Sequence, residues 1–230
     1  MAAYYNEHDE RAAAWLRELI TAGVIADGEV DQRSIADVRP DDLRGFVQCH
    51  FFAGIGGWSY ALRLSEWPDD REAWSGSCPC QKHSSATRGR AVARDWAPEF
   101  CDLIEACRPR VVFGEQVATA DAWLDGICDR LETVDYTIIS AVLPAYSAGF
   151  DHARERIYFA CDTNRKSESG GAFNGEVARM PRPRCHSGDV VPTYGVPGDM
   201  ALMRAFGNAI VPQLAAEFIK SYCDVRGLRQ

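Results

Sequence analysis

The chain has 230 residues, 47% hydrophobic and 25% charged, a composition typical of one globular domain with a core. No apolar run approaches the roughly 20 residues of a membrane helix, and the N-terminal stretch MAAYYNEHDE carries acids where a signal peptide carries bases. The formal net charge of -8 argues against binding of nucleic acid through bulk electrostatics. We therefore expect a soluble, cytoplasmic protein that does not contact a membrane.

Strand and helix patterns alternate along the first 160 residues. Short apolar runs predict strands, and apolar residues at helical spacing predict helices. We expect strands at 2–6, near 29, and at 47–52, 73–77, 110–116, 136–143 and 152–159, with helices at 8–23, 58–67, 98–107 and 118–134 and a turn-rich or helical connection at 33–45. This alternation predicts an α/β fold with a doubly wound, mostly parallel sheet.

The pattern changes after residue 161. Gly, Pro, Ser and charged residues dominate up to about residue 198, and apolar helical spacing returns near residue 200. We predict three parts: an α/β domain at 1–161, a small loop-rich segment at 162–204, and a C-terminal helix at 205–230 that returns to the α/β domain.

Nine cysteines are spread along the chain without a regular spacing, which favours free thiols over a disulfide framework. Cys78 and Cys80 flank a proline and could form a metal clip. His83 and Cys101 are the nearest further ligands, and they match no standard zinc spacing, so we expect no metal site. A second interpretation makes Cys80 a nucleophile and Cys78 a packed thiol.

The stretch FAGIGGW follows a predicted strand and precedes a predicted helix. Backbone of this kind can approach a ligand closely, although such glycines also serve to pack a helix on a sheet. The spacing G-x-G-G lacks the full dinucleotide fingerprint, which argues against an NAD-binding domain. The candidate cofactor-binding residues of this turn are Phe52, Ala53, Gly54, Ile55, Gly56, Gly57 and Trp58.

Two acids occupy similar places in the N-terminal part. Glu7 follows the first predicted strand, and Glu29 is expected to follow the next. An acid at the carboxyl edge of a sheet can accept hydrogen bonds from ribose hydroxyls. Either residue could equally be a solvated surface acid.

Five short motifs occur in one order: FAGIGG, PCQ, GEQV, HARER and RAFGNAIVPQLA. Together they resemble the cytosine-C5 DNA methyltransferases, over about residues 52–160 and 205–219. The resemblance implies a Rossmann-like methyltransferase fold, S-adenosyl-L-methionine as cofactor and double-stranded DNA as substrate. The target cytosine would have to leave the helix stack before it could react.

The resemblance assigns catalytic roles to Cys80, Glu115, Arg154 and Arg156. Carbon 5 of cytosine is a poor nucleophile, so a thiolate must first add to carbon 6. Basic side chains near Cys80 would favour the thiolate, and Glu115 can protonate ring nitrogen 3 from a partly closed pocket. Arg154 and Arg156 alternate along a strand, where they could hold the base oxygen, the phosphate or Glu115, or form an ordinary surface ion-pair ladder.

The remaining assignments also follow from the resemblance. Glu7 would hold the ribose and Glu29 the adenine, while Pro79 and Asn208, at the expected start of the last helix, would support the cofactor pocket. The candidate DNA-binding residues lie in two basic stretches, and they are Gln81, Ser84, Arg88, Arg90, Arg179, Arg182 and Arg184. A solvated loop is the other interpretation of the second stretch.

The chain departs from the family pattern in four respects. The acid-bearing strands precede the glycine turn, so the strands would lie side by side in a rearranged sequence order, with the cofactor at the switch point. Gln116 replaces an asparagine, His152 replaces a glutamine, and the loop after Cys80 lacks the usual acid-x-arginine-glycine run. Only residues 162–204 are available for target recognition, which predicts short or loose sequence specificity.

Three functional hypotheses follow. The first is a compact DNA cytosine-C5 methyltransferase of the kind found among phage or prophage enzymes. The second is a catalytically degenerate methyltransferase fold that binds DNA or a partner. The third keeps the chemistry on a free cytosine nucleotide or single-stranded nucleic acid. The oligomeric state is left open.

Overall fold

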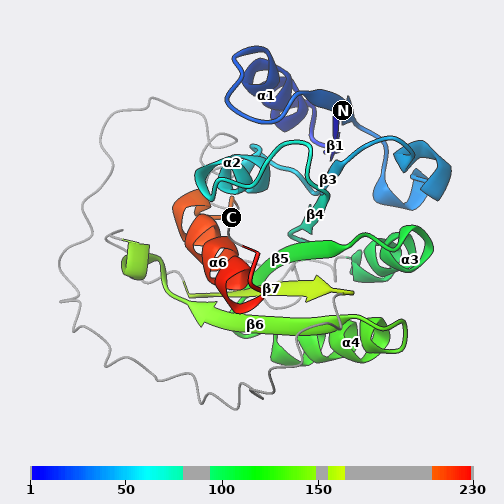
Figure 1. The fold of residues 1–230 in the computed structure, drawn as a ribbon. Coiled ribbons are helices and arrows are strands. Elements are labelled where there is room, and N and C mark those ends of the chain that lie inside the picture. The colour runs from blue at the N-terminus through cyan, green and yellow to red at the C-terminus, as the bar shows by residue number, and fades with distance from the viewer. Residues whose placement is uncertain (1, 80–93, 149–154, 164–208, 229–230) are drawn as a thin grey trace, which may run out of the picture.

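The structure is a computed structural model that describes residues 2–79, 94–148, 155–163 and 209–228. The strands in this part of the chain are β1 (Ala3–Asn6), β2 (Gly28–Asp31), β3 (Gln48–Phe51), β4 (Ala73–Gly76), β5 (Val111–Val117), β6 (Thr137–Leu143) and β7 (Arg156–Asp162). They form one sheet in the order β2-β1-β3-β4-β5-β7-β6 (Figure 1). Strands β1 to β5 are parallel to one another, and β7 is antiparallel to β5 and β6.

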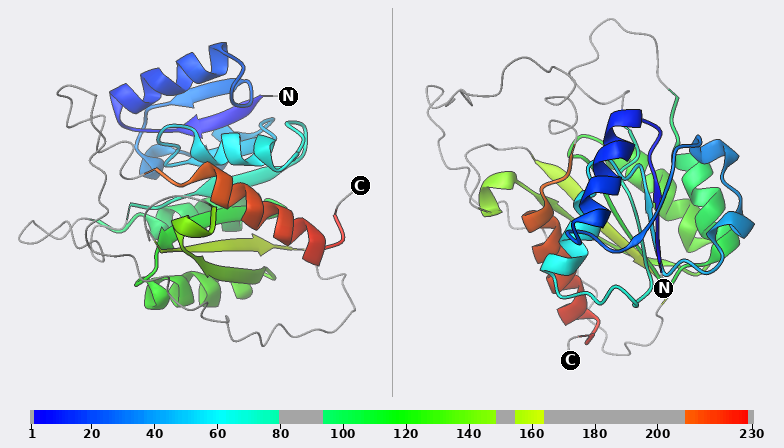
Figure 2. Two further views of the ribbon diagram at one scale, coloured as in Figure 1. Left: turned by 90° about the vertical axis from the view of Figure 1, so that its left-hand side faces the viewer. Right: turned by 90° about the horizontal axis from the view of Figure 1, so that it is seen from above.

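Helices cover both faces of the sheet (Figure 2). They are α1 (Glu10–Thr21), α2 (Gly57–Leu64), α3 (Ala97–Cys107), α4 (Asp121–Glu132) and α6 (Pro212–Val225), together with the short 3-10 helices η1 (Ile35–Asp37), η2 (Pro40–Leu43) and η4 (Ala145–Ala148). Helices α1, α2 and α6 lie on one face, and η1, η2, α3 and α4 lie on the other. The doubly wound, mostly parallel sheet and its rearranged strand order are both confirmed.

Helix α1 illustrates how the local sequence sets an element's limits. The carboxylate of Asp9 accepts hydrogen bonds from the backbone N–H groups of Arg11 and Ala12, which satisfies two free donors of the first turn. Gly23 has a φ of 67°, a conformation that ends helices readily and that glycine adopts without strain. The helix buries Ala13 and Leu16 against the sheet, so it is held by packing as well as by its cap.

The rearranged order changes the hand of one crossover. Helices α1 and α2 cover the same face, but the chain moves from β1 toward the β2 edge of the sheet and from β3 toward the β6 edge. The β3-α2-β4 crossover therefore has the opposite hand to β1-α1-β2, whereas β4-α3-β5, with its helix on the other face, shares the hand of β1-α1-β2. Such crossovers have a single hand in about 98% of cases, so β3-α2-β4 is the exception.

Aromatic side chains fill both layers between helices and sheet. On the α3 and α4 face, Phe51 packs against Trp74 and Phe100, with ring centroids 5.1 and 5.2 Å apart. On the α2 and α6 face, Phe113 contacts Trp58 and Tyr222 at 6.1 and 5.3 Å. Since strand residues alternate between faces, neighbouring residues of the same strands build the two cores.

A buried ion pair ties the last helix to the sheet. Arg226, which follows α6, donates from Nε to Oδ2 of Asp162 at 2.8 Å, and the Tyr222 hydroxyl donates to the same oxygen at 2.9 Å. The side chain of Asp162 is 1% exposed. Helix α6 begins at Pro212 and not next to Asn208 as expected, because a proline is well suited to the first turn of a helix.

Polar side chains form a second buried feature, between β1, β3, β4 and α2. The Tyr5 hydroxyl donates to the carbonyl of Ala26 and lies 3.0 Å from Ser59 Oγ. Next to it, His50 stacks on Tyr5 at 5.0 Å, and its Nδ1 lies 2.8 Å from Ser75 Oγ. His50 is almost wholly buried, and burial lowers its pKa to about 3.

Within the described residues, no helix is long and apolar enough to cross a bilayer. The seven cysteines in this part of the chain are all free thiols. No group of three or more His, Cys, Asp or Glu side chains there could hold a metal ion.

Substitution of Gly114 tests the close packing of β5 on β7. A Cβ at Gly114 would lie 2.0 Å from Cζ of Phe159, whereas a Cβ at Gly126 in α4 would meet no described atom within 4 Å. We expect Gly114→Ala to lower the free energy of unfolding by about 1–3 kcal/mol, and Gly126→Ala to raise it by about 0.5–1 kcal/mol. Urea unfolding measures both. Equal stability of Gly114→Ala and the parent protein would contradict this packing.

Buried His50 should make the stability depend on pH. The unfolded chain binds a proton at His50 below about pH 6.5, but the folded protein does so only near its lowered pKa of about 3. Stability should therefore fall as the pH is lowered from neutrality, by about 2 kcal/mol at about pH 5. Urea unfolding between pH 7 and 5 measures the slope. His50→Asn should remove this contribution, and His8→Asn, at an exposed site, should not; an unchanged slope in His50→Asn would contradict the assignment.

Candidate active site

Apart from Glu29, the predicted site residues that the structure describes gather at one edge of the sheet. Glu7 follows β1, the glycine turn follows β3, and Pro79 follows β4 by three residues. Glu115 lies near the end of β5, and Arg156 begins the antiparallel β7 opposite Val117. Because parallel strands end at the same edge, the topology brings together residues that are far apart in the sequence.

The glycine turn has an unusual backbone. Phe52, Gly54 and Gly56 have φ values of 51°, 55° and 80°, and Gly56 is the N-cap of α2. The turn is joined to β1, because Ala53 N donates to the carbonyl of Asn6 at 3.0 Å. Among the described residues, a Cβ at Gly54 would meet only the carbonyl oxygen of Phe52, at 3.9 Å, so they leave this part of the backbone open. A ligand could therefore approach the main chain closely at Gly54.

Glu7 lies directly against this turn. Its Oε2 accepts a hydrogen bond of 2.7 Å from the backbone N–H of Gly54, and its Oε1 accepts one of 2.8 Å from Asp9. The half-buried carboxylate thus joins the end of β1 to the turn after β3. Each carboxylate oxygen has a second lone pair, so both can still accept a hydrogen bond from a ligand.

Glu29 does not lie where we expected it. It is an exposed residue inside β2, paired in register with Tyr4, and does not follow the strand. The acid at the carboxyl end of β2 is Asp31, whose carboxylate accepts hydrogen bonds from the Tyr4 hydroxyl and from Arg33. The expected position was wrong because β2 extends beyond the apolar residue of the motif GEV to Asp31, after which the polar residues Gln32 and Arg33 follow.

Two aromatic residues of the turn point away from the open edge. The ring of Phe52 packs edge-on against Phe100 of α3, at 6.3 Å. Trp58 is 4% exposed, and its ring lies between α2 and the sheet. Of the predicted cofactor-binding residues in the turn, only positions 52–55 are partly exposed, and 56–58 are buried.

The segment after β4 is held from two sides. The indole N–H of Trp58 donates to Ser77 Oγ at 3.0 Å, and Nε2 of Gln116 donates to the carbonyl oxygen of Cys78 at 3.1 Å. The Cys78 side chain is buried, and Pro79 is exposed. These contacts were not predicted, since hydrogen bonds between distant segments leave no spacing in the sequence.

Glu115 and Arg156 form an ion pair. Nε of Arg156 lies 2.9 Å from Oε1 of Glu115, and Glu115 is 6% exposed. Of the three partners considered for the arginine, the structure therefore shows Glu115. Nη1 of Arg156 also donates to the carbonyl of Glu155 at 2.8 Å. The ion pair and this one hydrogen bond hold the guanidinium beside a carboxyl group that is buried at the edge of the sheet.

Several predicted residues lie outside the described residues. They are the candidate nucleophile Cys80, the candidate catalytic residue Arg154, the candidate cofactor residue Asn208, and the candidate DNA-binding residues Gln81, Ser84, Arg88, Arg90, Arg179, Arg182 and Arg184. Their roles remain predictions.

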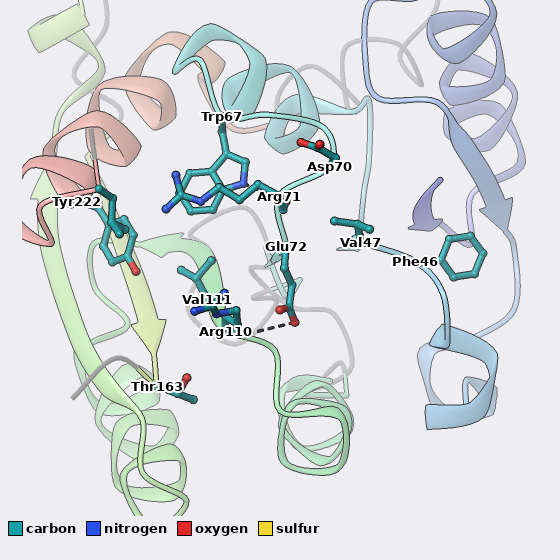
Figure 3. Close-up of a pocket in the computed structure, with 11 residues that line it drawn as sticks. Phe46, Val47, Trp67, Asp70, Arg71, Glu72, Arg110, Val111, Thr163 and Tyr222 are labelled. Atoms are coloured by element: carbon teal, nitrogen blue, oxygen red, sulfur yellow. Dashed lines mark hydrogen bonds between the residues drawn. The ribbon is translucent and has the colours of Figure 1, made fainter. Parts of the chain in front are cut away.

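A pocket of about 710 Å³ lies at the opposite edge of the sheet (Figure 3). Its walls include Glu72 before β4, Arg110 before β5 and Thr163 after β7. Arg71 covers the ring of Trp67, 4.0 Å from its centroid. None of the predicted site residues that the structure describes lines this pocket, so it is separate from the edge where Glu7 and Glu115 lie.

The comparison with protein families identifies the chain. Residues 62–194, more than half of the chain, match the family model described as C-5 cytosine-specific DNA methylase. The chain belongs to this family. The prediction made from the five motifs is confirmed, and the methylase match contains PCQ, GEQV and HARER. The motif FAGIGG and the acid-bearing strands β1 and β2 lie before the matched residues, and the motif RAFGNAIVPQLA lies after them. The rearranged part of the methylase fold is therefore outside the match.

Solved structures that this chain resembles include other methyltransferases. A triple mutant of DNMT2 from Spodoptera frugiperda is 12% identical, with a TM-score of 0.53 over 78% of this chain and 47% of that chain. A protein described as a DNA modification methyltransferase of prophage Cp in E. coli is 13% identical, with a TM-score of 0.41 over 70% of this chain and 47% of that chain. S. pombe Dnmt2 is 12% identical, with a TM-score of 0.39 over 73% and 51%.

This methylase chain is short beside its structural neighbours. It spans about half the length of the first of these chains, and at such low identity the likeness concerns the fold alone. No curated protein sequence gives a significant match.

The buried Cys78, which directly precedes the PCQ motif, should be unreactive in the folded protein. Burial raises the pKa of the Cys78 thiol well above its ordinary value, and the side chain is 4% exposed. We expect Cys78 to remain unmodified when the native protein is treated with iodoacetamide at neutral pH, and to react in urea. Half-buried Cys107 serves as the comparison. Mass spectrometry of peptides gives the extent of labelling, and labelling of native Cys78 as fast as Cys107 would contradict its burial.

Proposed function

We propose that this protein transfers a methyl group from S-adenosyl-L-methionine to carbon 5 of cytosine in double-stranded DNA. One observation supports this most directly: the Glu115 and Arg156 pair lies at the same edge of the sheet as Glu7, the glycine turn and the segment that ends at Pro79. The next residue in the chain is Cys80. A methyl donor on the turn and a cytosine beside the pair would be close to the nucleophile.

The residues of the turn fit this cofactor. The backbone at Gly54 faces open space, and the Glu7 carboxylate beside it can accept hydrogen bonds from ribose hydroxyls. Asp31, at the end of the adjoining strand, is the acid placed to approach the adenine side, in preference to Glu29. When bound, S-adenosylmethionine supplies an electrophilic methyl group. Family membership supports the same cofactor.

Each candidate side chain has a defined chemical task. The Cys80 thiolate forms a bond from Sγ to carbon 6 of the cytosine, and ring electrons move toward carbon 5 and nitrogen 3. Glu115, when protonated, donates to nitrogen 3, while Arg156 holds its carboxyl group in place. When carbon 5 takes the methyl group, S-adenosylhomocysteine would be the leaving group, and a base would then remove the hydrogen of carbon 5 as a proton. The bond from Sγ to carbon 6 breaks as the double bond between carbons 5 and 6 forms again, and nitrogen 3 returns its proton to Glu115. These steps give 5-methylcytosine and restore both the thiolate and the acid.

The substrate and its recognition form a further part of the proposal. The target base would have to be turned out of the duplex to reach a nucleophile at the edge of the sheet. Recognition is assigned to residues 162–204 and to the basic residues around Cys80. A segment this short would place few side chains against base edges, so the sequence specificity is expected to be short or loose.

The reaction can be tested with isotope-labelled S-adenosylmethionine and unmethylated duplex DNA of mixed sequence. After digestion to nucleosides, mass spectrometry should detect labelled 5-methylcytosine. Cys80→Ala should abolish the product and leave cofactor binding within about twofold, because the thiolate is needed only for the chemical step. Cys128→Ala, in α4 away from the edge, is the matched control. Product formed by Cys80→Ala would rule out the mechanism.

Glu115→Gln tests the acid in the same assay. It should lower the rate by about 10²- to 10⁴-fold, the usual contribution of general acid-base catalysis. The matched control is Glu217→Gln, an exposed residue of α6 paired with Lys220. A rate for Glu115→Gln close to that of the parent protein would remove Glu115 from the mechanism.

The same assay separates the two other hypotheses. Product on single-stranded DNA or a cytosine nucleotide, but not on duplex, would select the altered substrate, which the net charge of -8 favours. Cofactor binding without product on any substrate would select the degenerate methyltransferase fold.

A further inference from the structure

A hydrogen bond joins the segment that follows β3 to the segment that follows β4, in the middle of the site. Trp58 is the second residue of α2, directly after the glycine turn, and Ser77 is the first residue after β4. Nε1 of Trp58 donates to Oγ of Ser77 at 3.0 Å. Ser77 precedes Cys80 by three residues. The hydrogen bond thus connects the candidate cofactor turn with the segment that leads to the candidate nucleophile.

The indole ring of Trp58 is itself fixed by the two strands that carry the ion pair. It stacks on Phe113 of β5, with centroids 6.1 Å apart and planes at 21°, and meets Tyr158 of β7 edge-on at 6.2 Å. Phe113 lies two residues before Glu115, and Tyr158 lies two residues after Arg156. Residues two apart in a strand share a face, so the ring rests on the same face as the ion pair.

The segment is also held from β5. Nε2 of Gln116 donates to the carbonyl of Cys78 at 3.1 Å, and the Cys78 side chain is buried in the core beside α3. The side chain of Ser77 is therefore fixed by Trp58 of α2, and the carbonyl group of Cys78 is fixed by Gln116 of β5. With both neighbours anchored, the backbone enters Pro79 with a defined position relative to Glu115 and Arg156.

We propose that Trp58 is a positioning residue for methyl transfer: its indole N–H holds Ser77, and thereby sets the backbone that presents Cys80 to a base beside Glu115. This inference rests on the proposed function. It differs from the role expected of Trp58 in cofactor binding, because the side chain is buried and its polar atom is directed at Ser77. Loss of the N–H should affect the chemical step more than cofactor binding, since the turn has its own contacts with Glu7 and Asn6.

Trp58→Phe retains an aromatic ring and removes the donor, Ser77→Ala removes the acceptor, and the double variant removes both. Trp67→Phe is the matched control, because Trp67 is also buried against Phe113, and its Nε1 donates to the carbonyl of Arg71 at the opposite edge. The measurements are the single-turnover rate of methyl transfer with saturating cofactor and DNA, and the dissociation constant of the cofactor.

We expect Trp58→Phe and Ser77→Ala each to lower the single-turnover rate about tenfold, since a small displacement of reacting groups is costly. The cofactor dissociation constant should change by less than about twofold, and the double variant should be no slower than either single variant, because one interaction is removed in all three. Trp67→Phe should retain the parental rate. Equal rates for Trp58→Phe and Trp67→Phe, or losses that multiply in the double variant, would overturn the inference.

A second measurement does not depend on activity. Hydrogen exchange of the peptide that contains residues 75–80, followed by mass spectrometry, should become faster in Trp58→Phe and Ser77→Ala but not in Trp67→Phe. If the parent protein transfers no methyl group, the proposed function fails, and faster exchange still supports Trp58 as the residue that holds this segment. Unchanged exchange would overturn the inference even in an active enzyme.

Discussion

The parallel pairing of β3 with β1 on one side and β4 on the other is the constraint on which the site depends. It places the glycine turn after β3 between Glu7 and Ser77, and the hydrogen bonds from Gly54 to Glu7 and from Trp58 to Ser77 both follow from it. A change of register at β3 would move the turn relative to both neighbours, since each residue of a strand is paired on both sides. The four buried residues of β3 fix that register, because Cys49 and Phe51 pack into the core beside α3. On the other face, Gln48 donates to the carbonyl of Pro68 and His50 lies within hydrogen-bond distance of Ser75.

The strands follow one another along the chain in a rearranged order, yet the site residues still lie at one edge of the sheet. Strands β1 and β2 precede β3 in the sequence but lie outside it in the sheet, so the chain must return across the α3 face and then pass through α2 to β4. The opposite hand of the β3-α2-β4 crossover is the consequence. The packing of α2 on α6, and of Trp58 on Phe113, holds that crossover in place from the side away from α3.

The two ends of β7 carry buried charges with different surroundings. Arg156 pairs with Glu115 at the carboxyl edge of the parallel strands, whereas Asp162 pairs with Arg226 at the other edge, where Tyr222 adds a second hydrogen bond. Removal of one partner from a buried pair leaves an unpaired charge, which is destabilising by about 3–5 kcal/mol. The second pair ties α6 to the sheet, and the first holds a carboxyl group at the edge proposed for the reaction.

The sequence by itself determined the order and type of the elements, the doubly wound sheet and the methylase family. Apolar spacing follows directly from the period of a helix or strand, and the motifs PCQ, GEQV and HARER are local patterns. It also indicated that Glu7 and Glu115 lie at one edge of the sheet, because each follows or ends a parallel strand.

Only the tertiary structure decided that Asp31 and not Glu29 ends β2, that Arg156 pairs with Glu115, and that Trp58 and Gln116 hold the segment before Pro79. Trp58 and its partner Ser77 are 19 positions apart, Gln116 and Cys78 are 38 apart, and Glu115 and Arg156 are 41 apart. The exact end of a strand and the partner of a side chain depend on packing between distant segments, which no local period records.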